Sequence, residues 1–229
     1  FIFFLLTRFG IYQVSLLQQR RGLDRGYATS AYSGEKPGRY RAMISHAKST
    51  HGATARWFQL ELGSYAGGKS SIFLDSDDLV NLNTLLATVR DRVDVLVVLA
   101  TEDIWWRPWC AGEIAVATAA GVSIVLVWMG GDSMESINFR DIASKVRSSI
   151  SEQQLETTLA PYGISYDEIE VAYVKLEQAV RVKFSIKDMR DIGNLLWKVA
   201  EQAQLTPTMK QSPRNIRKRM AKVAAGLRI

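Results

Sequence analysis

The sequence predicts an α/β fold in which a mostly parallel, five-stranded sheet is covered by helices on both faces. Residues 93–100 and 122–129 are nearly continuous in apolar side chains, which is typical of parallel strands buried on both faces. Apolar runs alternate with segments of helical periodicity along residues 40–204. Glycine and polar clusters separate these segments and keep the connections short.

The expected elements follow in chain order and share these two periodicities. We expect strands at residues 40–45, 71–74, 93–100, 122–129 and 179–184. We expect helices at residues 54–62, 79–89, 108–120, 139–159, 166–178 and 185–199. Residues 46–52 are polar and predict a loop between the first strand and the first helix.

Several helix ends carry capping signals. Pro108 stands where its missing N–H costs least, at a helix start, and Gly121 is placed to end the same helix. Ser76 or Asp77 is a plausible cap for the helix at 79–89. Ser185 with Asp188 resembles a capping box that opens the last helix.

The composition is that of a globular chain with basic ends. A length of 229 residues with 47% apolar and 23% charged residues suits one large domain, or one domain with appendages. We expect an N-terminal apolar and basic segment with a linker at 1–39, a domain at 40–204 and a basic extension at 205–229. The net charge of +6 is concentrated near the two ends. No recognisable nucleic-acid-binding module accompanies it, so we expect no nucleic-acid partner.

The N-terminal segment leaves two interpretations open. Residues 1–6 are strongly apolar, but Arg8 interrupts a run that is shorter than the roughly 20 residues a membrane span needs. The run is either the stump of a transmembrane helix, with basic residues up to Arg25 as its cytoplasmic anchor, or an amphipathic helix packed on the domain. Because the chain starts with Phe1, we expect a fragment or a processed chain. A single cysteine, Cys110, excludes an intrachain disulfide and fits a reducing, cytoplasmic location.

Standard catalytic signatures are missing from the sequence. It holds no phosphate-binding glycine loop, no dinucleotide fingerprint, no Cys/His cluster for a metal and only two histidines. What remains is a set of polar residues that follow the predicted strands. In a parallel sheet the carboxyl ends share one edge, so these residues are expected to converge. They are Ser45, His46, Lys48, Asp75, residues 101–103, Trp109 and Glu113.

The stretch Trp105-Trp106-Arg107-Pro108-Trp109-Cys110-Ala111-Gly112-Glu113 holds three of the six tryptophans and the only cysteine. Trp109 and Glu113 lie four residues apart and therefore on one face of the predicted helix, which favours a joint role in a site. The competing interpretation is that Glu113 faces solvent, as glutamates in a second helical turn usually do. Cys110 is expected to be a small helix residue, and Trp105 and Trp106 to pack a loop or form an assembly surface.

Four pieces of the chain, in this order and spacing, resemble the TIR (Toll/interleukin-1 receptor) domain family over residues 40–204. They are Ile44-Ser45-His46, Ile72-Phe73-Leu74-Asp75 followed by Asp77-Asp78-Leu79, Val95-Leu96-Val97-Val98-Leu99-Ala100-Thr101, and Trp109-Cys110-x-x-Glu113. Three features differ from the family, and one of them is that residues 132–178 are longer than the family's typical connection. The aromatic–arginine pair after the first strand is replaced by His46-Ala47-Lys48, and residues 75–80, which match the family's BB loop, lack its common glycine.

The resemblance implies a flavodoxin-like three-layer fold and, for the enzymatic branch of the family, cleavage of the nicotinamide–ribose bond of NAD⁺. It implies that Glu113 is the catalytic carboxylate and that Trp109, Ser45, His46, Lys48 and Asp75 contact the substrate. NAD⁺ would be the substrate, with no cofactor or metal, and activity would require self-association of TIR domains or contact with other TIR proteins. A cyclic product is left open. The alternatives are a non-catalytic TIR interaction module and, more weakly, a nucleoside hydrolase or deoxyribosyltransferase.

Overall fold

A computed structural model describes residues 39–66, 68–75, 84–129, 137–184 and 192–205, which belong to one unit that begins at Arg39. Several expectations lie outside these residues. They are the N-terminal segment and linker, the cap at Ser76 or Asp77, the capping box at Ser185 and Asp188, and nearly all of the basic extension. Within the described residues, no helix has both the length and the apolar character that crossing a bilayer requires.

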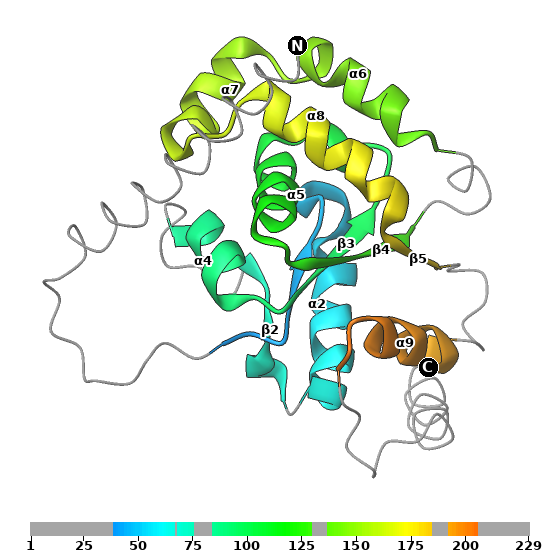
Figure 1. Ribbon diagram of the computed structural model, residues 1–229. Coiled ribbons are helices and arrows are strands. Elements are labelled where there is room, and N and C mark those ends of the chain that lie inside the picture. The colour runs from blue at the N-terminus through cyan, green and yellow to red at the C-terminus, as the bar shows by residue number, and fades with distance from the viewer. Residues whose placement is uncertain (1–38, 67, 76–83, 130–136, 185–191, 206–229) are drawn as a thin grey trace, which may run out of the picture. The chain divides into compact units, whose positions relative to one another are not determined.

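The sheet has five strands in the order β2-β1-β3-β4-β5, and every pairing is parallel (Figure 1). The strands are β1 (Ala42–Ser45), β2 (Ile72–Phe73), β3 (Val95–Ala100), β4 (Ser123–Trp128) and β5 (Val180–Lys183). β3 and β4 form the longest pairing, from Val95 opposite Ser123 to Ala100 opposite Trp128. The predicted α/β class is confirmed, and this strand order is the flavodoxin-like one.

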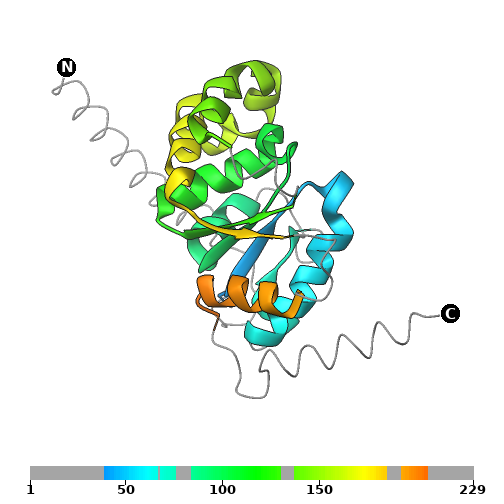
Figure 2. The same ribbon diagram turned by 90° about the vertical axis from the view of Figure 1, so that its right-hand side faces the viewer.

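Helices cover both faces of the sheet (Figure 2). α2 (Lys48–Ala66) and α9 (Ile192–Gln202) pack on one face. α4 (Leu85–Arg92), α5 (Pro108–Ala120), α6 (Phe139–Ser149), α7 (Glu152–Thr158) and α8 (Tyr166–Lys175) belong to the other side. Alternate residues of β3 serve the two cores, because successive side chains of a strand point to opposite faces. Val97 joins the α2 and α9 core, whereas Leu96 and Val98 join the other core.

Two helix predictions were wrong in their bounds. Residues 48–52 of the expected loop instead form the first turn of α2, which closes through bonds from the backbone N–H groups of Thr50 and His51 to the carbonyl of Ala47. His51 keeps a non-helical backbone (φ −126°, ψ 16°), so this turn meets the rest of α2 at a kink. The single helix expected at 139–159 is two, because Ser151 starts α7 with a capping box to Gln154.

A buried aromatic cluster fixes the loop between β3 and α5. This loop forms the 3₁₀ turn η3 (Ile104–Trp106). The Tyr173 hydroxyl of α8 donates a 2.6 Å hydrogen bond to the Trp105 carbonyl, and the two rings meet edge to face at 5.9 Å. Phe139 contacts Trp105 in the same way at 5.5 Å. Of the two roles expected for Trp105, loop packing and an assembly surface, its burial favours packing, and it positions the start of α5.

The end of α5 gives a stability test that involves backbone conformation alone. Gly121 caps the helix at φ 71°, and a Cβ added there would meet no atom within 4 Å. We predict that Gly121→Ala lowers the free energy of unfolding by about 1 kcal/mol, because a left-handed conformation strains an L side chain. Urea denaturation of the full chain measures the change.

Gly52 is the matched control for this substitution. It lies inside α2, also with no atom within 4 Å of an added Cβ, and its φ is not positive. Gly52→Ala should leave stability unchanged or raise it by up to about 1 kcal/mol, because alanine favours helix. The same sign of change in both variants would contradict the assignment of Gly121 as a left-handed cap.

Candidate functional site

The predicted site residues lie around the carboxyl ends of β1 and β3. These neighbouring strands send the chain to opposite faces of the sheet, since β1 continues into α2 and β3 continues through η3 into α5 (Figure 1). In open α/β sheets, ligands bind outside the carboxyl ends of the strands at such a switch point. The topology therefore places the polar residues predicted from sequence where this fold class holds its sites.

Glu113 in the second turn of α5 bonds across this switch point. The Ser45 hydroxyl at the end of β1 donates a 2.5 Å hydrogen bond to Glu113 Oε2. Glu113 is only 3% exposed, so the solvent-facing interpretation is wrong. Burial raises the pKa of Glu113 from 4.5 to about 8, and the bond from Ser45 opposes this increase. Glu113 is thus a protonated carboxyl group at neutral pH that a nearby positive charge can convert to a carboxylate.

Lys48 and Asp75 form an ion pair beside this bond. Lys48 Nζ lies 2.7 Å from Asp75 Oδ2, with the lysine side chain 53% exposed and the aspartate side chain 10% exposed. Their charges act on Glu113 in opposite directions, since Asp75 raises its pKa and Lys48 lowers it. The structure therefore groups Ser45, Lys48, Asp75 and Glu113, as the parallel topology predicted.

His46 and Cys110 complete the buried side of this group. His46 is 4% exposed, and burial lowers its pKa below the usual 6.5, so the ring is neutral at pH 7. Cys110 donates a 3.5 Å hydrogen bond from Sγ to the His46 carbonyl. Burial, together with the charge of Glu113, raises the pKa of the Cys110 thiol well above its usual range. Cys110 is therefore a small packing residue and not a thiolate nucleophile.

Trp109 is half-buried one turn before Glu113, and its ring packs against Tyr162 at 5.9 Å. Tyr162 belongs to the 3₁₀ turn η5 (Ala160–Tyr162) that precedes α8. Gly112 lies between Trp109 and Glu113 on α5, where an added Cβ would come within 2.6 Å of Leu159. The aromatic side of α5 thus packs closely on the α7–η5 segment, and Tyr162 is the ring that Trp109 contacts.

A polar network at the start of α5 includes Thr101 and Asp103, which were expected here from the sequence, but its links to Arg107 and Ser49 were not predicted. Arg107 binds Asp103 Oδ2 through Nε at 3.1 Å and through a terminal nitrogen at 2.8 Å. The same terminal nitrogen donates to Ser49 Oγ at 2.6 Å, and Thr101 Oγ1 donates to Asp103 Oδ1 at 2.7 Å. The network joins the segments that follow β1 and β3. The spacing of Asp103 and Arg107, four residues apart with opposite charges, was the available signal.

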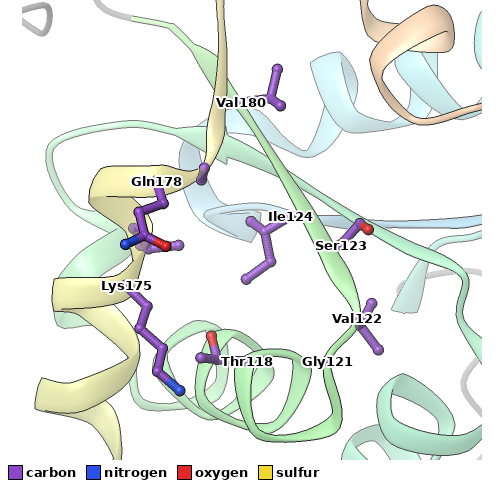
Figure 3. A pocket seen from close by; sticks show the side chains of 10 residues that line it. Thr118, Gly121, Val122, Ser123, Ile124, Lys175, Gln178 and Val180 are labelled. Carbon is purple, nitrogen blue, oxygen red and sulfur yellow. The ribbon is translucent and has the colours of Figure 1, made fainter.

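An open depression of about 330 Å³ lies at the amino-terminal ends of β4 and β5, away from these residues (Figure 3). Its rim includes Thr118 of α5, Lys175 of α8 and Gln178, and its floor includes Ile124 of β4. None of the predicted site residues lines it. In the part of the chain that the structure describes, no group of three or more His, Cys, Asp or Glu residues could hold a metal ion.

Comparison with known proteins gave no match, either to a family model or to a curated protein. A buried carboxyl group with one hydroxyl donor can stabilise a positive charge that develops beside it, or it can exchange a proton. Among the described residues of this group, the His46 ring and the Cys110 thiol are neutral at pH 7, so Glu113 is the candidate for the reacting group.

The raised pKa of Glu113 predicts how stability depends on pH. Between the unfolded pKa of 4.5 and the folded pKa of about 8, the folded state holds a proton that the unfolded state has lost. Stability must therefore fall as pH rises through this window. The amide of a glutamine side chain does not ionise. We therefore predict that Glu113→Gln is more stable than the wild type by an amount that grows from pH 4.5 to pH 8.

The expected gain at pH 8 is on the order of 4 kcal/mol, because each unit of pKa shift corresponds to about 1.4 kcal/mol. Urea denaturation at a series of pH values measures it. Glu156→Gln is the control, because Glu156 is an exposed residue of α7 whose substitution should give no pH-dependent gain. A gap between wild type and Glu113→Gln that stays constant with pH would contradict the raised pKa.

Proposed function

We propose that this chain is a TIR-type NAD⁺ glycohydrolase that cleaves the nicotinamide–ribose bond to give nicotinamide and ADP-ribose, and that self-association activates it. The proposal rests on one observation above the others: Glu113 is a buried carboxyl group held by Ser45 at the switch point of a β2-β1-β3-β4-β5 sheet. The resemblance of residues 40–204 to TIR domains supplies the reaction. A cytoplasmic location and contacts with other TIR proteins belong to the same proposal.

The reaction needs a single carboxylate. The bond between ribose C1′ and the nicotinamide nitrogen breaks, its electron pair neutralises the pyridinium, and nicotinamide leaves without an acid. The ribose becomes oxocarbenium-like, and a carboxylate beside it stabilises the positive charge. Water then adds to C1′ and loses a proton. Attack by another group of the same ADP-ribosyl unit would give a cyclic product instead.

The positive charge of the substrate compensates for the raised pKa of Glu113. A pyridinium close to Glu113 favours the ionised form and lowers its pKa from about 8. The carboxylate then forms where low solvent exposure strengthens its interaction with the ribose cation. Since Glu113 is 3% exposed, substrate contact requires a rearrangement of the groups around it. This requirement is consistent with an activity that depends on self-association.

The second candidate is a non-catalytic TIR interaction module. The observation that favours it is that Glu113 already has a hydrogen-bond partner and is buried, as a structural carboxyl group would be. On that hypothesis Glu113 has no substrate, and the chain acts by contact between copies. The two candidates differ in one measurable respect, which is the release of nicotinamide.

We predict that the full chain, at high concentration or with a crowding agent, releases nicotinamide from NAD⁺. Glu113→Gln should lower the rate by at least about 100-fold, because it removes the charge that stabilises the transition state. Chromatographic detection of nicotinamide measures the rate, and Glu156→Gln serves as the matched control. A wild type without activity under assembly conditions supports the interaction module. Equal activity in Glu113→Gln would keep the reaction and reject the site.

The pH dependence of kcat/KM gives a separate test. This quantity reports the ionisation of the free enzyme. Because the ionised form of Glu113 is the active one, we predict that kcat/KM rises with pH and levels off above about 8. Ser45→Ala should move the midpoint to higher pH, since the bond from Ser45 lowers the pKa of Glu113. A profile that is flat between about pH 6 and pH 9 would disagree with this assignment.

A further inference from the structure

Two buried polar atoms in the segments that follow β1 and β2 have no hydrogen-bond partner among the described residues. They are His46 Nε2 and Asp75 Oδ1. The residues follow neighbouring strands, because Met43 of β1 pairs with Phe73 of β2 and the chain continues from there to Ser45 and Asp75. Buried polar atoms in folded proteins are nearly always bonded, so two unsatisfied atoms at the ends of neighbouring strands call for an explanation.

Both atoms are hydrogen-bond acceptors. A hydrogen bond with the Ile44 backbone raises the pKa of His46, so the ring is the donor in that bond. Since Nε2 is the unpartnered nitrogen, Nδ1 is the donor, and a neutral ring then carries only a lone pair on Nε2. Asp75 binds Lys48 through Oδ2, which leaves Oδ1 as a second acceptor.

Two neighbouring acceptors are complementary to an NH₂ group, which has two N–H donors. The charge of Asp75 acts on both His46 and Glu113, so the three side chains lie in one electrostatic neighbourhood. In NAD⁺ the nicotinamide ring is bonded directly to the ribose carbon that reacts, whereas the adenine lies at the far end of the molecule. If Glu113 is at the ribose, the nearest NH₂ group of the substrate is the nicotinamide carboxamide.

We propose that His46 and Asp75 form the subsite for the carboxamide NH₂ group of nicotinamide and thereby select NAD⁺ over dinucleotides whose ring lacks this group. The inference rests on the proposed function of Glu113. Nicotinic acid adenine dinucleotide would present a carboxylate to the charge of Asp75. The 3-acetylpyridine analogue would present an uncharged methyl group, which leaves both acceptors unsatisfied. A site whose buried polar groups stay unpaired rejects an analogue strongly.

The test compares kcat/KM for NAD⁺ and the two analogues with the full chain. The wild type should prefer NAD⁺ over the nicotinic acid dinucleotide by about 100-fold or more. Asp75→Asn should reduce this preference at least about 10-fold, because the new amide can donate to a carboxylate. His46→Phe should reduce the preference over the uncharged analogue. The ratio of kcat/KM for NAD⁺ to kcat/KM for an analogue is unaffected by any change in Glu113 that slows all substrates equally.

Two matched variants control for the loss of a histidine and of an aspartate. His51→Phe changes the other histidine, which bonds Thr50, and Asp94→Asn changes an aspartate that is paired with Arg39. Both should keep the wild-type preference. Thermal unfolding identifies any variant that fails to fold. In that case, a comparison of ligand binding by NMR with Glu113→Gln replaces the kinetic comparison.

A binding measurement separates this proposal from the proposed reaction. Saturation-transfer NMR with Glu113→Gln compares free nicotinamide with nicotinic acid, and preferential binding of nicotinamide supports the subsite even if NAD⁺ is never cleaved. Equal binding of the two compounds overturns it. Cleavage of NAD⁺ and of the nicotinic acid dinucleotide with equal kcat/KM overturns it as well, while the assignment of Glu113 stands.

Discussion

The hydrogen bond from Ser45 to Glu113 is the constraint around which the site is built. It joins the end of β1 to the second turn of α5 across the switch point of the sheet, with both residues almost fully buried. One hydroxyl donor does not offset the loss of solvation, and the pKa of Glu113 therefore stays near 8. A carboxyl group that destabilises its own fold at neutral pH is typical of residues retained for function.

The layered fold was predictable because its signals are local. β3 and β4 are buried on both faces and are therefore continuous in apolar residues, and Gly121 ends α5 in a left-handed conformation that favours glycine. The errors in helix bounds have a different origin. The first turn of α2 depends on bonds to the Ala47 carbonyl, which polar residues of low helix propensity do not indicate. The break before α7 follows from the cap at Ser151, inside an otherwise helical pattern.

The sequence was enough to predict which residues of the site lie near one another, but not which of their side chains are in contact. Parallel strands place Ser45, Asp75 and the start of α5 at one edge whatever their side chains do. Which atoms meet depends on packing, so the bond between Ser45 and Glu113 and the contact of Trp109 with Tyr162 could not be derived. The burial of Glu113 was itself predictable. Glu113 is the only charged residue of α5, and a helix that is apolar all round is buried.

The most informative measurement is the pKa of Glu113 itself. A ¹³C NMR titration of the side-chain carboxyl carbons, with the Glu113 signal assigned by its absence in Glu113→Gln, follows this one group in the full chain. We predict a midpoint near pH 8, shifted upward again in Ser45→Ala. A midpoint near 4.5, unaffected by Ser45→Ala, would mean that Glu113 is an ordinary solvated carboxylate and would contradict the role assigned to it.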